Sequence, residues 1–112
     1  MKMIKCYIQH EKLEAVREKL FELGVPGLSV KDAKGIGKPM SQLQSSPDSK
    51  VPQFHPNVEI SIVLENEAVG EVVDTLVAIV QTGNLSDGKI FILPVEDAIR
   101  IRTGEKGTQA LY

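Results

Sequence analysis

The sequence predicts a single α+β domain, in which two helices cover one face of a four-stranded antiparallel sheet. Three observations support this prediction. Two stretches with apolar residues at helical spacing are interspersed with four short stretches typical of strands. The chain has 112 residues, enough for one domain with its own core. Its 42% hydrophobic and 25% charged residues are ordinary for a globular protein.

The first half of the chain supplies a strand, a helix and a second strand. Apolar and polar residues alternate along residues 3–9, which predicts the first strand. Residues 12–23 repeat apolar side chains at helical spacing. Gly24 and Pro26 mark the end of that helix, because glycine accepts the conformation after a helix and proline cannot continue one. Residues 28–33 are short and mixed, and they predict the second strand.

The second half repeats this order. Residues 57–65 alternate cleanly and predict a third strand, and residues 89–93 predict a fourth. Between them, residues 67–81 form an amphipathic helical pattern, with Asn66 as the N-cap and Gly83 after the end. The resulting order β-α-β-loop-β-α-β is that of the ferredoxin-like fold.

Two parts of this fold are expected to do more than build the core. Residues 38–56 contain four prolines, four serines and no periodicity, and such a long irregular stretch in a compact domain is usually functional or disordered. The second face of the sheet is expected to carry Tyr7, Val63 and Phe91. These side chains are too apolar to be left in water, so we predict self-association through the sheet.

The last third of the chain, residues 82–107, contains the candidate site. A glycine-rich turn ends at Gly88 and leads through Lys89 into the fourth strand, and Arg100 and Arg102 follow two residues apart. In an extended segment this spacing places both guanidinium groups on one face, next to Lys89 if the chain doubles back. Backbone N–H groups freed by glycine, an ammonium group and two guanidinium groups are the donors that bind a polyphosphate.

Composition excludes several other classes of protein. The net charge of -2 gives no general basic field for nucleic acid, so an anion site must be local. Cys6 is the single cysteine and lies in a strand pattern, and neither His10 nor His55 has a metal-ligand partner at a useful spacing. We expect no metal site. No apolar run approaches the roughly 20 residues of a membrane span, and the N-terminus has no signal-peptide pattern, so we expect a cytoplasmic protein without membrane insertion.

The candidate site resembles the C-terminal signature of the PII signalling protein family. The matching residues are Thr82, Gly83, residues 87–91, Pro94, Val95 and residues 100–105. The opening residues 1–5, the helix end at Leu23 and Gly24, and residues 34–37 match as well. The resemblance covers the whole chain except residues 38–56.

The resemblance implies a homotrimer of ferredoxin-like subunits that acts as a regulator and not as an enzyme. Sheets would face inward, and adenine nucleotides would bind in the clefts between subunits. A T-loop, about residues 37–56, would dock on a membrane transporter or metabolic enzyme, and about residues 95–112 would form a C-terminal extension. By position, the nucleotide-binding residues would be Ser29, Gly35, Gly37, Lys38, Val63, Asp87, Gly88, Lys89, Arg100 and Arg102.

The family pattern also gives most of these residues roles. Gly88, Lys89, Arg100 and Arg102 would hold the phosphates. Gly35, Gly37 and Lys38 would border the nucleotide at the base of the T-loop. Ser29 and Val63 would lie near the adenine and the ribose.

Departures from the family pattern narrow the expected effectors. Pro39 replaces a glutamine and Asn57 replaces a lysine that bind 2-oxoglutarate in other members, and residues 38–56 contain no tyrosine for uridylylation. Ser86 replaces a glycine and Ser61 an acidic residue, so ADP or AMP is expected to be preferred over ATP. This combination resembles the carboxysome-associated and bicarbonate-transporter-associated PII-like proteins, which makes bicarbonate a candidate second effector.

Two alternatives stay open. The first is a conventional nitrogen-status PII regulator that responds to 2-oxoglutarate through other residues. The second is a slow nucleotide phosphohydrolase, which needs a positioned base besides the cations. Asp87 would be the first carboxylate to consider for that role and Glu105 the second.

Overall fold

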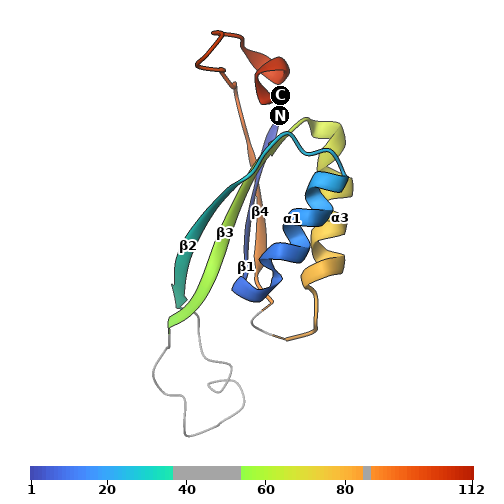
Figure 1. The fold of residues 1–112 in the computed structure, drawn as a ribbon, viewed down its shortest axis with the longest axis vertical. Helices are drawn as coiled ribbons and strands as arrows, with labels where there is room; N and C mark the ends of the chain where they lie inside the picture. Colours follow the sequence, from blue (N-terminus) through green and yellow to red (C-terminus); the bar gives the residue numbers. More distant parts are fainter. Residues whose placement is uncertain (37–53, 85–86) are drawn as a thin grey trace, which may run out of the picture.

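A computed structural model describes residues 1–36, 54–84 and 87–112. The strands are β1 (Lys2–Gln9), β2 (Ser29–Ile36), β3 (Phe54–Leu64) and β4 (Lys89–Pro94), and they form one antiparallel sheet in the order β2-β3-β1-β4. The helices α1 (Leu13–Glu22) and α3 (Asn66–Val80) lie side by side on one face of that sheet (Figure 1). Short 3-10 helices occupy His10–Lys12 and Gly107–Leu111. The predicted ferredoxin-like fold is confirmed.

The core lies between the sheet and the two helices. Because side chains alternate along a strand, the even-numbered residues 4–8 of β1 and 58–64 of β3 face α1 and α3. Each helix contributes the apolar stripe that its spacing predicts. The fully or almost fully buried apolar residues are Ile4, Cys6, Ile8, Val16, Leu20, Val25, Val58, Ile60, Ile62, Leu64, Val72, Leu76 and Val80.

The helix ends agree with the sequence in one case and differ in the other. After α1, the Gly24 amide donates to the Phe21 oxygen at 3.0 Å and the Val25 amide to the Leu20 oxygen at 3.3 Å, the pair of bonds that defines a Schellman ending. For α3 the predicted cap is wrong. Asn66 is the first residue of the helix, and Glu65 is the N-cap, without a side-chain capping bond.

Strands β2 and β3 extend further than their side-chain patterns predict. The ladder continues to the pair Ile36 and Phe54, so residues 54–56 belong to β3 although they fall in the range expected for the loop. Pairing continues there because β2 and β3 satisfy each other's backbone N–H and C=O groups, whatever the side-chain pattern. Pro56 is tolerated because β1 ends at Gln9, opposite Asn57, and β3 has a neighbour on one side only beyond that point.

The second face of the sheet carries an apolar surface that no helix of the described chain covers. Register places Tyr7 beside Lys89, Phe91 beside Lys5 and Val63 beside Met3, all on this face. The Tyr7 and Phe91 rings meet edge to face with centroids 6.0 Å apart, and Phe91 remains 50% exposed. The predicted position of these three residues is confirmed, and self-association through them stays a prediction. No helix in the described ranges is long and apolar enough to cross a membrane.

Candidate functional site

Gly88 is required by close packing at the start of β4. Its φ of 115° lies in the region that favours glycine. A Cβ at this position would overlap the main-chain oxygen of Tyr7 and come within 2.9 Å of the Tyr7 carbonyl carbon. The turn therefore passes directly over β1, and this glycine is needed for the fold whether or not it also contacts a ligand.

Asp87 stabilises the same turn. Its carboxylate accepts hydrogen bonds from the amide of Thr82 at 2.7 Å, from the amide of Gly83 at 2.9 Å, and from the Thr82 hydroxyl. The bond from the Thr82 side chain and then those from the backbone hold the pKa of the Asp87 carboxyl below its usual value. A carboxylate with this many donors is a turn-stabilising group and a weak proton acceptor, which argues against the role of base in the hydrolase alternative.

The stability contributed by Asp87 is expected to depend on pH. Because its pKa in the folded chain is depressed, the stabilisation is present above the unfolded value near 3.9 and is lost as pH falls through the folded value. Asp87→Asn should therefore lower the free energy of unfolding at pH 7, and the gap to the wild type should narrow below about pH 4. Urea unfolding at both pH values checks this, with the exposed Asp74→Asn as control. A gap that is the same at both pH values would contradict the assignment.

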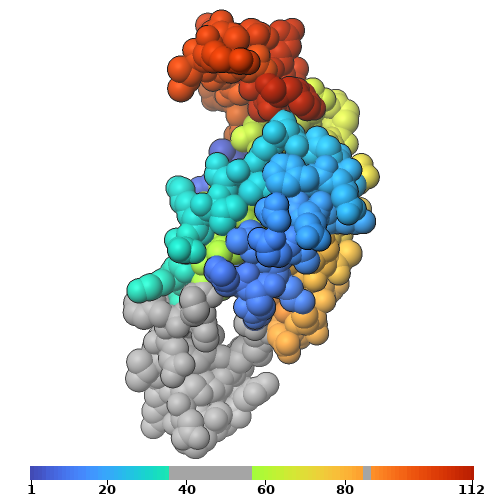
Figure 2. Space-filling view, viewed as in Figure 1, coloured from blue at the N-terminus to red at the C-terminus, as the bar shows by residue number. Residues whose placement is uncertain are grey.

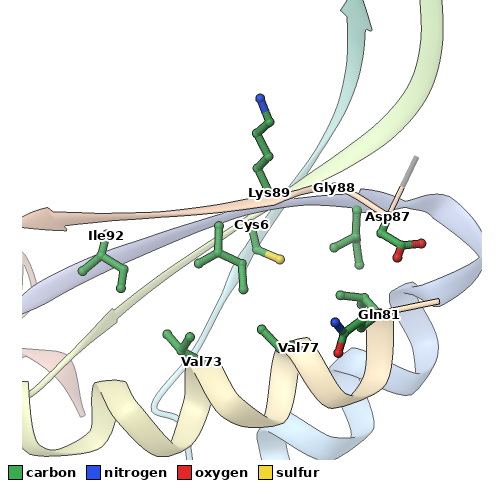
Figure 3. Close-up of a pocket in the computed structure, with 11 residues that line it drawn as sticks. Cys6, Val73, Val77, Gln81, Asp87, Gly88, Lys89 and Ile92 are labelled. Carbon is green, nitrogen blue, oxygen red and sulfur yellow. The ribbon is translucent and has the colours of Figure 1, made fainter. Parts of the chain in front are cut away.

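Lys89 projects to the uncovered face of the sheet. It pairs in register with Tyr7, and its ammonium group points away from α3 (Figure 3). Together with the Gly88 main chain it forms the cationic part of this corner of the sheet. Gly35 lies at the same end of the sheet, two residues along β2 from Ala33, the partner of Asn57. The Asn57 side-chain nitrogen is 3.3 Å from the position that a Cβ on Gly35 would occupy.

The two arginines do not lie on a strand, so the prediction of an extended segment there is wrong. An isolated bridge joins Ile99 to Lys106, and the chain turns between them. The Arg100 amide donates to the Glu105 oxygen at 2.9 Å, and the Gly104 amide donates to the Arg100 oxygen at 2.7 Å. These bonds close a compact hairpin, residues 99–106, within the C-terminal segment, residues 95–112. Figure 2 shows this segment, in red, projecting from the end of the body.

Arg100 and Arg102 differ in their surroundings. The Arg100 guanidinium forms an ion pair with Glu105 at 2.9 Å and donates to the main-chain oxygens of Gln109, at 2.5 Å, and Tyr112. Arg102 is exposed on the turn. Arg100 therefore holds the C-terminal segment together, whereas Arg102 presents its charge to solvent. The pairing with Glu105 was missed from the sequence, where the opposite charges on either side of Gly104 were the available signal.

The predicted nucleotide-binding residues fall into two groups at opposite ends of the sheet. The loop corner, as we call the end of the sheet where β2 ends and β4 begins, comprises Gly35 at the β2 edge and Asp87, Gly88 and Lys89 at the β4 edge. The arginine corner comprises Ser29, Val63, Arg100 and Arg102, because Ser29 pairs with Ser61, Val63 with Met3, and Pro94 with Lys2. Gly37 and Lys38 lie outside the described residues, as do Pro39 and Ser86.

The two corners are too far apart for one phosphate group to touch both within a single chain. Lys89 is beside Tyr7, and Pro94 is beside Lys2 at the other end of β1, so five residues of strand, roughly 17 Å, separate them. The hairpin that carries Arg100 and Arg102, which we call the arginine turn, lies beyond Pro94 (Figure 1). The expectation that Lys89 and the arginines meet when the chain doubles back is therefore wrong for one chain, because β4 runs antiparallel to β1 and carries the chain to the far end.

Comparison with known proteins agrees with this architecture over the whole chain. The family model described as nitrogen regulatory protein P-II matches residues 1–105. Proteins named nitrogen regulatory protein P-II from Azospirillum brasilense and Cereibacter sphaeroides are 39% and 43% identical over 112 residues, which cover 99% of this chain and all of each relative. A crystal structure of Arabidopsis thaliana PII bound to citrate superposes with a TM-score of 0.79 at 31% identity, covering 98% of this chain and 88% of that one. The chain therefore belongs to the nitrogen regulatory protein P-II family.

Proposed function

We propose that this protein is a homotrimeric, cytoplasmic signalling protein that binds adenine nucleotides between its subunits. The T-loop, about residues 37–56, would pass the nucleotide state to a membrane transporter or a metabolic enzyme. The observation that carries this proposal is the separation of the loop corner from the arginine corner, with an uncovered apolar face between them. Two copies that meet through that face can bring one copy's loop corner to the other's arginine corner.

The chemistry of the two corners fits the two ends of a nucleotide. The loop corner offers the Lys89 ammonium group and the main-chain amide of Gly88, and Arg102 of a second copy would add a charged fork, all of which favour phosphate oxygens. Beyond the phosphates, Ser29 and Ser61 pair on the same face as Val63. Small hydroxyl groups beside an apolar side chain are a reasonable environment for ribose and adenine.

Arg100 would take part in binding by exchanging partners. Its guanidinium already contacts a carboxylate and two main-chain oxygens in the described chain. A phosphate group at this corner would compete with Glu105 for it. Nucleotide binding would then loosen the C-terminal segment while it orders the loop corner of the neighbour, which is a population shift that a partner can detect.

The second effector is proposed to be bicarbonate rather than 2-oxoglutarate. At the loop corner the side chain beside Gly35 is the neutral amide of Asn57. A positively charged side chain at this position would favour a dicarboxylate, and the amide does not. A small anion needs fewer cationic donors than a dicarboxylate does. A regulator that responds to bicarbonate would act on inorganic-carbon uptake, so we propose a partner of that kind.

Calorimetry with one ligand series tests these assignments. ATP, ADP and AMP are expected to bind, 2-oxoglutarate added with Mg-ATP is expected to give no heat of binding, and bicarbonate is expected to alter nucleotide affinity. Absence of binding by all three nucleotides would contradict the proposed function. Saturable binding of 2-oxoglutarate would leave the nucleotide site standing but replace the carbon link with the nitrogen one.

A conventional nitrogen-status regulator is the second candidate, because full-length relatives at 39–43% identity carry the name nitrogen regulatory protein P-II. It would need residues other than Asn57 and Pro39 to hold the oxo-acid. The hydrolase alternative has less support, because the Asp87 carboxylate is already engaged by Thr82 and Gly83.

A further inference from the structure

An open groove separates α3 from the edge strand β4. It has a volume of about 400 Å³, and its apolar walls include Val73 and Val77 from the helix and Ile90 and Ile92 from the strand (Figure 3). Val77 is 39% exposed and Ile92 is 49% exposed, so the groove is open to solvent within one chain. Asp87 and Gln81 lie together at the loop-corner end of this groove, and the Lys89 ammonium group points away from it.

Ile101 is the most exposed large apolar side chain in the described ranges. It is 97% exposed at the tip of the C-terminal hairpin, between Arg100 and Arg102. The hairpin is held by the Ile99–Lys106 bridge and by the bond from the Gly104 amide, so its tip is presented in a defined shape. A branched apolar side chain held fully in water on a closed turn is typical of a contact that is completed by another surface.

We propose that Ile101 of one copy inserts into the α3–β4 groove of a second copy. This inference rests on the proposed function, because a shared nucleotide site brings the arginine turn of one subunit to the loop corner of its neighbour. The groove ends at that corner, where Asp87 and Gln81 lie beside Gly88 and Lys89. Because β4 is the edge of the sheet, a hairpin that brings Arg102 to the Lys89 face of this strand would place the adjacent Ile101 toward its other face, at the end of the groove.

Charge and polarity support the same occupant. Arg102, the exposed arginine next to Ile101, is complementary to the negative charge of the Asp87 carboxylate at the end of the groove. The apolar side chain of Ile101, with a cation next to it, matches the apolar walls of the groove, with the Asp87 carboxylate at one end. The contact joins different surfaces of the two copies, which is the kind of interface that closes a ring.

Disulfide trapping tests the contact directly. In the double variant Val77→Cys/Ile101→Cys, mild oxidation is expected to link neighbouring chains, because the two positions would meet across the interface. Within one chain they are kept apart, since Val77 lies beside the start of β4 and Ile101 follows the far end of that strand. Each single variant is the control for the native Cys6, which also lines the groove but is fully buried, with its pKa raised to about 11, so that its thiol reacts poorly. Covalent chains from the double variant alone support the inference. Absence of linkage in a protein that still assembles and binds nucleotide overturns it and leaves the proposed function intact.

A second experiment measures how much the contact contributes. Ile101→Ser is expected to raise the concentration at which the assembly half-dissociates by at least about tenfold, the effect of losing one buried branched side chain. Phe21→Ser is the matched control, because Phe21 is a large apolar residue on α1 with 50% exposure and no place in this contact. Analytical ultracentrifugation reads both variants. Equal dissociation of Ile101→Ser and wild type would contradict the proposed contact.

Discussion

Gly88→Ala is expected to destabilise the protein by at least about 3 kcal/mol, the range typical of a backbone clash combined with strain. The new Cβ would overlap the Tyr7 main-chain oxygen and approach its carbonyl carbon to 2.9 Å, and both atoms belong to the central strand β1. A flexible side chain could move aside, but a strand that is paired on both sides cannot. The start of β4 would have to leave the sheet.

Gly104→Ala is the matched control for this variant. Gly104 also has a positive φ, 74°, but a Cβ there would meet nothing within 4 Å. It should cost only about 1 kcal/mol, the ordinary penalty for alanine in a left-handed conformation. Chemical denaturation of the two variants separates the clash from the backbone penalty. Similar free energies of unfolding for both would show that the turn can relax away from Tyr7.

Arg102→Ala is expected to weaken nucleotide binding by about 1.5–3 kcal/mol, which corresponds to roughly 10–150-fold in the dissociation constant. Arg102 is exposed on the hairpin, so its removal should leave the fold of the chain unchanged. Arg100→Ala is expected to differ, because that side chain also pairs with Glu105 and holds the main-chain oxygens of the C-terminal segment. Its loss should reduce stability as well as binding.

The measurement is calorimetric titration with ATP and ADP. Arg17→Ala is the control, because Arg17 is exposed on α1, which covers the other face of the sheet, and pairs with Glu14. Its affinity should equal that of the wild type. Wild-type affinity in Arg102→Ala as well would place the phosphates elsewhere.

The helices and strands could be predicted because each buries one side. Ile4, Cys6 and Ile8 face the helices while their neighbours on β1 face the other way, so the alternation in the sequence reports a physical difference between the two faces. Strand ends were less predictable. Residues 54–56 join β3 through backbone pairing with β2, which leaves no regular side-chain pattern.

The arginine turn shows why the site was harder to predict than the fold. Arg100, Ile101 and Arg102 alternate as a strand would, but the bond from the Gly104 amide and the ion pair with Glu105 close a turn instead. The sequence spacing also predicted that Lys89 lies close to these arginines. In the structure β4 separates them, because Lys89 is at one end of this strand and the arginines follow its other end. Distances of this kind depend on the topology of the sheet, and local patterns do not contain them.

The most direct test of a nucleotide site shared between two copies is to mix two defective chains. Lys89→Ala removes the cation of the loop corner and Arg102→Ala that of the arginine corner, and each variant alone should bind nucleotide poorly. When both are co-expressed, a Lys89→Ala chain can still supply its arginine corner to an Arg102→Ala chain. About a quarter of the sites should then recover wild-type affinity in a randomly mixed ring. A mixture that binds no better than either variant alone would contradict the account, because it would place both residues in the site of one chain.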